Sequence, residues 1–179
     1  MDLCGAQIKL TINAVELDQM FLKPTYSVNG DISLLDIEQL YADGIRGLII
    51  DLDSTLMAPK SGVIDPVTQE WIARARGRFK MVVLTNNKRE AYISNAGKVL
   101  DMPVIGYAAK PWKAGFRKAL DALSLPPAEV AVVGDRPLTD IWGGALSDMR
   151  TVLVRPLACI VEPSIKTFFR NLEHVFIRR

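Results

Sequence analysis

Asp51-Leu-Asp53-Ser-Thr55 directly follows Gly47-Leu-Ile-Ile50, a short run in which every side chain after the glycine is apolar. A continuously apolar run of this length is typical of a strand buried on both faces of a parallel sheet. Acidic residues after such a strand lie where open α/β sheets gather their ligands, just beyond the carboxyl ends of the strands. This stretch therefore predicts a fold class and the place of a functional site.

Apolar runs of the same kind recur along the chain, with helix-length segments between them. The predicted strands cover residues 47–50, 81–84, 104–107, 130–133 and 151–154. The predicted helices cover residues 66–77, 88–100, 112–123 and roughly 139–147. Strands and helices that alternate at this interval predict an α/β fold with a doubly wound, Rossmann-like parallel sheet. An earlier helix is expected after Ser33-Leu-Leu-Asp36, which resembles an N-cap, with Gly44 at its end.

Length and composition fit one domain. The chain has 179 residues, of which 49% are hydrophobic, which is enough to bury a core and argues against global disorder. One helix and its loops fill each interval between predicted strands, so little room is left for an inserted cap domain. We expect a single capless domain over residues 1–179, with an N-terminal arm over 1–30 and an amphipathic helix over 163–179.

Charge and rare residue types argue against several function classes. The formal net charge of +2 is too small to indicate nucleic-acid binding, and no nucleic-acid partner is expected. Cys4 and Cys159 form no metal-binding cluster, and the single histidine, His174, has no nucleophile turn near it. Neither a secretion signal nor a run of about 20 apolar residues is visible. We expect a cytoplasmic protein, with peripheral contact to the inner face of a membrane as an open alternative.

Polar side chains follow each of the first four predicted strands. In chain order they are Asp51 and Asp53, Thr85 and Asn86, Lys110, and Asp135 with Asp140. Because parallel strands end at the same edge of a sheet, we expect these side chains to converge. Four carboxylates brought together repel one another unless a hard divalent cation lies among them, and Mg²⁺ takes carboxylates together with waters and phosphate oxygens. The sequence therefore predicts a Mg²⁺ site.

The same side chains suit the cleavage of a phosphate monoester. Attack by the Asp51 carboxylate on a dianion requires charge cancellation, which Mg²⁺ and Lys110 can supply. The Thr85 hydroxyl and nearby backbone N–H groups can hold phosphoryl oxygens. Asp53 can protonate the leaving alkoxide and then deprotonate the water that opens the acyl phosphate. These residues favour a phosphatase that passes through an aspartyl-phosphate intermediate.

Four motifs together resemble the haloacid-dehalogenase-like (HAD) hydrolases, subfamily IIIA. They are Asp51-Leu-Asp-Ser-Thr-Leu56, Leu84-Thr-Asn-Asn87, Lys110-Pro111 and Val132-Val-Gly-Asp-x₄-Asp140. Further segments are similar to the YqeG family, a capless branch related to the phosphatidylglycerophosphate phosphatases of mitochondria and chloroplasts. These segments are Phe21-Leu-Lys-Pro24, Asp36-Ile-Glu-Gln-Leu40, Gly44-Ile45 and Gly134-Asp-Arg-Pro-Leu-Thr-Asp140. The similarity covers roughly residues 20–160 and departs at Ser54, where the family commonly has Asn.

The resemblance implies a role for each residue. Asp51 becomes the nucleophile and Asp53 the acid/base. The implied metal ligands are Asp51, Asp53 through its backbone carbonyl, Asp135 and Asp140, the last directly or through water. The residues implied to bind the phosphoryl group are Thr85, Asn86 and Lys110. The implied cofactor is Mg²⁺, and the implied reaction is the conversion of the membrane lipid phosphatidylglycerophosphate to phosphatidylglycerol.

Other functions stay open at this point. An HAD phosphatase could act instead on a soluble sugar phosphate, a nucleotide or a phosphoprotein, and an inactive family member is also conceivable. A receiver domain of two-component signalling also places Asp, Thr and Lys at successive strand ends, as Asp51, Thr85 and Lys110 are placed here. A receiver, however, needs an adjacent acidic pair one strand upstream, and it has no Gly-Asp-x₄-Asp after its lysine.

Two basic segments bear on the membrane question. The helix expected over residues 163–179 carries aromatic residues on one face and basic residues besides, so it could lie on an anionic lipid surface or pack on the sheet. Trp112, Lys113, Arg117 and Lys118 follow Lys110 closely. They could form a basic rim for a lipid headgroup or an ordinary solvated helix face.

Overall fold

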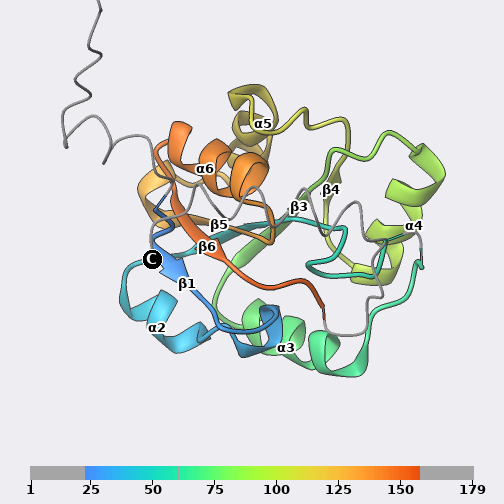
Figure 1. Cartoon of the computed structure of the whole chain (residues 1–179), viewed down its shortest axis with the longest axis horizontal. Helices are drawn as coiled ribbons and strands as arrows, with labels where there is room; N and C mark the ends of the chain where they lie inside the picture. Colours follow the sequence, from blue (N-terminus) through green and yellow to red (C-terminus); the bar gives the residue numbers. More distant parts are fainter. Residues whose placement is uncertain (1–22, 60, 158–179) are drawn as a thin grey trace, which may run out of the picture.

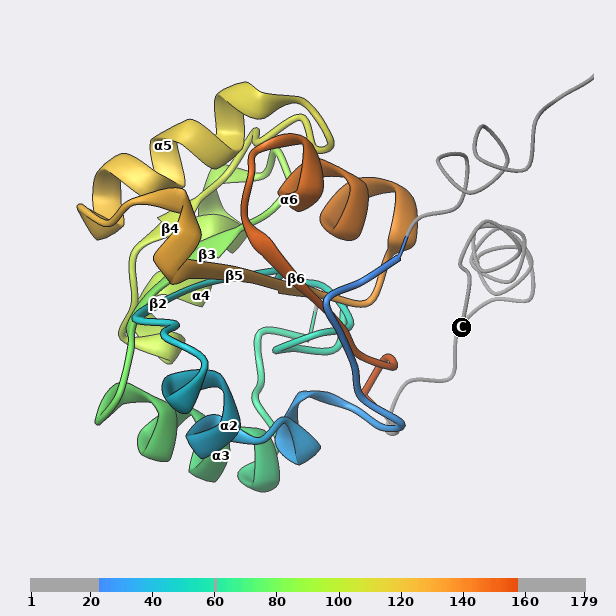
Figure 2. The same ribbon diagram turned by 90° about the vertical axis from the view of Figure 1, so that its left-hand side faces the viewer.

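The computed structural model describes residues 23–59 and 61–157, which form a parallel sheet with helices on both faces (Figure 1, Figure 2). The strands are β1 (Tyr26–Ser27), β2 (Gly47–Ile50), β3 (Lys80–Leu84), β4 (Val104–Ile105), β5 (Val130–Gly134) and β6 (Arg150–Leu153). The six strands are ordered β1-β6-β5-β2-β3-β4, and every neighbouring pair is parallel. The expected doubly wound α/β class is confirmed.

Helices cover both faces of this sheet. The α-helices are α2 (Ile37–Ala42), α3 (Pro66–Arg76), α4 (Glu90–Leu100), α5 (Lys113–Leu123) and α6 (Trp142–Leu146). Short turns of 3₁₀-helix are η1 (Ile32–Leu34) and η2 (Pro127–Glu129), and the π-helical turn η3 (Pro137–Ile141) runs directly into α6. One core cluster joins α2, α3 and α4 to the sheet, and a second joins α5 to its other face (Figure 2).

The central strand β2 explains why its sequence is continuously apolar. Leu48 and Ile50 belong to the core cluster under α2 and α3, whereas Ile49 belongs to the cluster under α5. Successive side chains of a strand point to opposite faces, so a strand with helices on both sides needs an apolar residue at each position. The acidic segment that follows β2 is therefore anchored by a fully buried strand.

Two elements differ from the sequence-based prediction near the N-terminus. The helix predicted after Ser33 begins later, at Ile37, because Asp36 caps it by accepting from the N–H groups of Glu38 and Gln39. Ser33 lies instead in η1, where Asp31 accepts from its backbone N–H. Strand β1 was not predicted, because two residues are too few to show a period. It pairs with β6 at the edge of the sheet.

Strand β4 is shorter than the predicted 104–107. It ends at Ile105, and the Tyr107 N–H donates to the Asn87 carbonyl rather than to the neighbouring strand. Tyr107 and Ala109 both have φ of +52°, which turns the chain away from the sheet. The chain is thereby directed back over the strand ends, where Lys110 lies.

Several predictions fall outside the described residues. These are the C-terminal helix over 163–179, most of the arm over 1–30, and the isolated Cys4, Cys159 and His174. Within residues 23–59 and 61–157, no helix is long and apolar enough to cross a membrane.

At the turn after α2, the effect of left-handed backbone on stability can be tested apart from side-chain crowding. Gly44 has φ of +88°, and a Cβ atom placed there would meet nothing within 4 Å. Gly44→Ala should lower the free energy of unfolding by about 1 kcal/mol, because left-handed backbone is unfavourable for an L residue. Gly77→Ala is the matched control, since Gly77 ends α3 with φ of −70° and should tolerate the methyl group. Equal effects of the two changes in chemical denaturation would contradict this account.

Candidate active site

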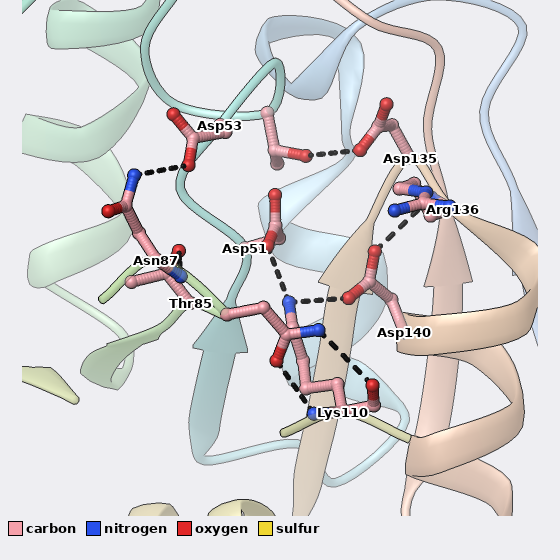
Figure 3. A network of polar contacts seen from close by, with 10 residues as sticks. Asp51, Asp53, Thr85, Asn87, Lys110, Asp135, Arg136 and Asp140 are labelled. Carbon is pink, nitrogen blue, oxygen red and sulfur yellow. Dashed lines mark hydrogen bonds and ion pairs between the residues drawn. The ribbon is translucent and has the colours of Figure 1, made fainter. Parts of the chain in front are cut away.

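The polar residues predicted from the sequence lie together at the carboxyl edge of the sheet (Figure 3). Asp51 and Asp53 follow β2, Thr85 follows β3, and Asp135 follows β5. Ile50 pairs with Val133, so the residues beyond β2 and β5 start from the same level. Lys110 reaches the group from the loop between β4 and α5.

A buried lysine lies at the centre of this group. The Lys110 Nζ atom lies 2.5 Å from Asp51 Oδ1 and 2.6 Å from Asp140 Oδ1. The three side chains are 3%, 13% and 1% exposed, respectively. Removing an ammonium from water is unfavourable unless it is paired and hydrogen-bonded, and here both conditions are met. The lysine thus has its charge fixed beside the carboxylate expected to act as nucleophile.

The protonation of Asp51 depends on its charged neighbours. Burial raises the pKa of the Asp51 carboxyl to about 7; the Lys110 ammonium opposes this rise, and the charges of Asp140 and Asp53 add to it. Burial alone lowers the pKa of Lys110, but the charges of Asp140 and Asp51 outweigh burial and raise it above its usual range. Lys110 is therefore a permanent cation, whereas the anionic form of Asp51 gains from any further positive charge nearby.

Three carboxylates lie close enough to share a metal ion. One oxygen each from Asp51, Asp135 and Asp140 lies within 4.8 Å of the other two. Mg²⁺ prefers oxygen ligands, and carboxylates are its usual protein ligands. The donor set therefore fits a hard divalent cation, and a cation there would also offset the burial that disfavours the charged form of Asp51. Asp53 is not part of this carboxylate trio in the described residues.

Asp140 is positioned by its own turn and by a missing side chain. The N–H of Arg136, the residue just before η3, donates to Asp140 Oδ2 at 3.2 Å. A Cβ atom at Gly134 would lie 2.4 Å from the Asp140 carboxyl carbon, closer than any real contact. Glycine at the end of β5 therefore lets the Asp140 carboxylate approach the strand and reach Lys110.

The loop after β2 forms a tight turn around Ser54. Ser54 has φ of +74°, and its N–H donates to the Met57 carbonyl. Asn adopts left-handed backbone more readily than most residues, so Ser54 holds a conformation that Asn would adopt more easily. The next residue, Thr55, is buried and donates from Oγ1 to Asp135 Oδ1 at 3.4 Å. This turn thus ties the β2 loop to the acid that follows β5.

Asn86 binds the backbone of Lys110 in this structure. Its Oδ1 accepts from the Lys110 N–H at 2.7 Å, and its Nδ2 donates to the Lys110 carbonyl at 3.1 Å. The Thr85 Oγ1 atom accepts from the Asn87 N–H at 3.1 Å. The peptide bond between Lys110 and Pro111 is cis. The side-chain amide of Asn86 therefore holds the lysine loop in place, and contact between Asn86 and phosphate stays a prediction.

Comparison with known proteins places this arrangement in a family. The chain is 31% identical over 121 residues to the "Probable phosphatase YqeG" of Bacillus subtilis. The alignment covers 68% of this chain and 70% of that protein. This chain belongs to the haloacid-dehalogenase-like hydrolases, in the YqeG family. The HAD-hydrolase-like family model matches residues 107–156, which include Lys110, Asp135 and Asp140. The chain is thus an HAD-family phosphatase, and the receiver-domain alternative is wrong.

Two other relatives of this family member carry a more specific name. This chain is 29% identical to the phosphatidylglycerophosphate phosphatase 1, chloroplastic/mitochondrial, of Arabidopsis thaliana, in an alignment that covers 94% of the chain. It is 30% identical to phosphatidylglycerophosphate phosphatase 1, chloroplastic, of Chlamydomonas reinhardtii, over 83% of the chain. The chain spans 51% and 59% of the lengths of these two proteins.

Solved structures support the fold. An uncharacterized protein from Listeria monocytogenes aligns with a TM-score of 0.53 at 18% identity, covering 66% of this chain and 85% of its own. The HAD-hydrolase YfnB from Bacillus subtilis, bound to magnesium, aligns with a TM-score of 0.51 at 11% identity, covering 67% and 91%. At these identities the likeness concerns the fold alone.

Sequence reasoning missed two side chains that contact the acid Asp53. The Tyr92 hydroxyl donates to Asp53 Oδ1 at 2.9 Å, and Asn87 Nδ2 lies 3.5 Å from Asp53 Oδ2. Asn87 was visible within the second HAD motif but had no role assigned. Tyr92 is one residue of a predicted helix, and nothing in a single sequence distinguishes it from a core aromatic. Only the packing of α4 beside the β2 loop reveals this contact.

The close approach at Gly134 leads to a test in this YqeG-family protein. Gly134→Ala should push the Asp140 carboxylate away from Lys110 and reduce phosphatase turnover by about 100-fold or more, since small displacements at a reacting centre are costly. Gly144→Ala is the matched control, because its methyl group would meet Thr151 and Val132 rather than the site. Both variants should lose stability in thermal unfolding. Equal losses of turnover per folded molecule would contradict this role of Gly134.

Proposed function

We propose that this protein is a Mg²⁺-dependent phosphatase that cleaves phosphate monoesters through an aspartyl-phosphate formed on Asp51. The observation that carries the proposal is the buried Lys110 ammonium between Asp51 and Asp140, with a third carboxylate, Asp135, within reach of the same metal ion. Membership in the HAD family supports the same chemistry. We also propose that the active unit is a single capless domain.

The first half-reaction transfers the phosphoryl group to the protein. An Asp51 carboxylate oxygen attacks phosphorus, and the bond from phosphorus to the leaving oxygen breaks. Lys110 and the Thr85 hydroxyl bind phosphoryl oxygens, while Asp53 gives its proton to the leaving alkoxide. When bound, Mg²⁺ neutralises phosphoryl charge and orients the substrate. Because Lys110 is already charged and fixed, it stabilises the developing negative charge without reorganisation.

The second half-reaction returns Asp51 to its starting state. The Asp53 carboxylate takes a proton from a water molecule as that water attacks phosphorus. The bond between phosphorus and the Asp51 oxygen breaks, and inorganic phosphate leaves. Asp53 is then protonated again and ready for the next substrate. One residue therefore serves as acid and then as base, as expected for a group placed beside the leaving oxygen.

We propose phosphatidylglycerophosphate at a membrane surface as the substrate. The names of the Arabidopsis and Chlamydomonas relatives support this lipid. Tyr107 and Trp112, which flank Lys110 in the sequence, are 53% and 65% exposed, and Lys113 beside them is exposed as well. Aromatic and basic side chains together are typical of surfaces that contact anionic lipid.

More basic charge lies near this exposed pair. The hydrogen bond from the Tyr107 N–H to the Asn87 carbonyl brings the loop before α4 beside it, and Lys88 and Arg89 of that loop are exposed. Each basic side chain near an anionic surface contributes about 1 kcal/mol of binding. Arg117 and Lys118 continue the exposed basic sequence along α5. A bilayer would then cover the site in place of a cap domain.

The nucleophile can be tested directly. Asp51→Asn should reduce phosphate release by at least about 10³-fold, because it removes the attacking charge while keeping the shape of the side chain. The folded state should survive, since Lys110 retains Asp140 as a partner. Asp148→Asn, at an exposed acid, is the control and should leave turnover unchanged. Retention of near-full activity by Asp51→Asn would rule out the mechanism.

The metal requirement has two independent readouts. Phosphate release should need Mg²⁺, stop in EDTA and fall with excess Ca²⁺, which prefers a larger and looser oxygen shell. Mg²⁺ should also stabilise the fold, by about 2.7 kcal/mol at 100 times its Kd, because it binds carboxylates that repel one another. Asp135→Asn should weaken this thermal stabilisation. Undiminished turnover in a thoroughly chelated sample would contradict the requirement.

The lipid substrate is tested by comparing esters. Phosphate release from phosphatidylglycerophosphate in anionic vesicles should exceed release from glycerol 3-phosphate and from hexose phosphates. Changing Arg89 and Lys113 together to Gln should slow the vesicle reaction only, whereas Lys98→Gln, near the other end of α4, should change neither reaction. If the soluble esters are hydrolysed far more efficiently, the lipid assignment is wrong and the phosphatase mechanism stands.

A further inference from the structure

The carboxyl group of Asp53 is held from both sides by the segment that follows β3. The Tyr92 hydroxyl donates to Oδ1 at 2.9 Å, and Asn87 Nδ2 lies 3.5 Å from Oδ2 (Figure 3 shows the contact with Asn87). The shorter contact is an ordinary hydrogen bond, whereas the longer one is at the limit of such a bond. Tyr92 is therefore the stronger of these two restraints on the Asp53 carboxyl.

Tyr92 is well placed to act as a fixed donor. It lies in the first turn of α4, its side chain is half-buried, and it packs against the core cluster under α3. A tyrosine ring packed in this way carries its hydroxyl on a rigid arm with few rotatable bonds. The hydroxyl position is thus set by the packing of α4 against the sheet rather than by the loop that carries Asp53.

Asp53 needs such a restraint because its own segment is irregular. It lies between β2 and α3, outside both, in an isolated bridge to Met57. An acid/base group must stay within hydrogen-bond reach of the leaving oxygen and then of the attacking water. A carboxyl group free to rotate on such a loop would spend part of its time out of reach. A side chain from a neighbouring helix removes that freedom.

We propose that Tyr92 is a positioning residue for the acid/base Asp53, holding the carboxyl group in its productive orientation through Oδ1. This inference rests on the proposed function, because it assigns a task within the same reaction. With Oδ1 engaged by the tyrosine hydroxyl, Oδ2 is the oxygen that gives a proton to the leaving alkoxide and later takes one from water. Tyr92 keeps its own proton throughout and does not touch the substrate.

The experiment compares substrates that differ in their need for an acid. Tyr92→Phe removes the hydroxyl and keeps the ring. For an alkyl ester such as glycerol 3-phosphate, kcat should fall about 10- to 100-fold with KM nearly unchanged, because the poor leaving group needs a well-placed proton donor. For 2,4-dinitrophenyl phosphate, whose leaving group needs no proton, the initial burst of dinitrophenolate should keep its wild-type rate.

The second half-reaction supplies a separate readout. Steady-state turnover of dinitrophenyl phosphate still needs Asp53 as a base, so Tyr92→Phe should slow it about 10-fold while the phospho-enzyme accumulates. In an Asp53→Asn background the same change should have less than about a 2-fold effect, since a residue that acts through another loses its influence when that other is removed. An unchanged 10-fold effect in that background would overturn the proposal.

Tyr26→Phe is the matched control. The Tyr26 hydroxyl donates to Asp43 Oδ2 at 2.7 Å and accepts from Arg150 at 3.3 Å, so this change also removes a hydrogen bond between a tyrosine and a carboxylate, but within β1. It should affect thermal stability about as much as Tyr92→Phe does and leave turnover unchanged. Equal kinetic effects of the two variants would show that Tyr92 acts only through stability.

The remaining outcomes separate this inference from the proposed function. If the wild-type protein turns over its substrates and Tyr92→Phe does so at the same rate, the inference is overturned and the proposed function stands. Faster turnover in Tyr92→Phe would also overturn it, because the tyrosine would then be holding Asp53 away from the substrate. Equal slowing of the alkyl ester and of the dinitrophenolate burst would assign Tyr92 to substrate binding instead. A wild-type protein that releases no phosphate from any ester would contradict the proposed function itself.

Discussion

An ammonium group buried between two carboxylates is the interaction on which the arrangement of this site depends. Lys110 is almost completely removed from water, and a buried charge left without a partner is strongly destabilising. Asp51 and Asp140 must therefore stay within hydrogen-bond distance of Nζ, although they follow different strands. That requirement ties the end of β2, the turn after β5 and the loop after β4 to a single geometry.

Several local features keep this geometry in place. The amide of Asn86 binds both backbone polar groups of Lys110, so the lysine loop is attached to the end of β3. The backbone at Tyr107 and Ala109 is left-handed, which turns the chain back across the strand ends. Gly134 leaves room for the Asp140 carboxylate. Each of these features of backbone or packing helps to hold a charged side chain in its place.

The balance of charge within the site fits the proposed metal and phosphate chemistry. Lys110 is paired with Asp51 and Asp140, and these two carboxylates lie close enough to Asp135 to share a cation. Burial disfavours the anionic form of Asp51, so added positive charge would favour the charged form that the proposed mechanism needs. Asp53, the proposed acid/base, stands apart from that trio and accepts a hydrogen bond from Tyr92 of α4. Asp51 and Asp53, the proposed nucleophile and acid/base, thus have different neighbours although they are only two residues apart in the chain.

The sequence by itself determined the fold class, the central strands and the residue types gathered at the sheet edge. It could do so because strands buried on both faces must be continuously apolar, and because parallel strands end at one edge. Only the tertiary structure decided which of these groups pair, that Asn86 binds the lysine backbone, and that Tyr92 reaches Asp53. Strand β1 and the late start of α2 were likewise beyond the sequence, because two residues show no period and because Ser33 and Asp36 both suit an N-cap. The contacts made by Lys110, Asn86 and Tyr92 join segments far apart in the chain. Their distances follow from how helices pack on the sheet rather than from any local pattern.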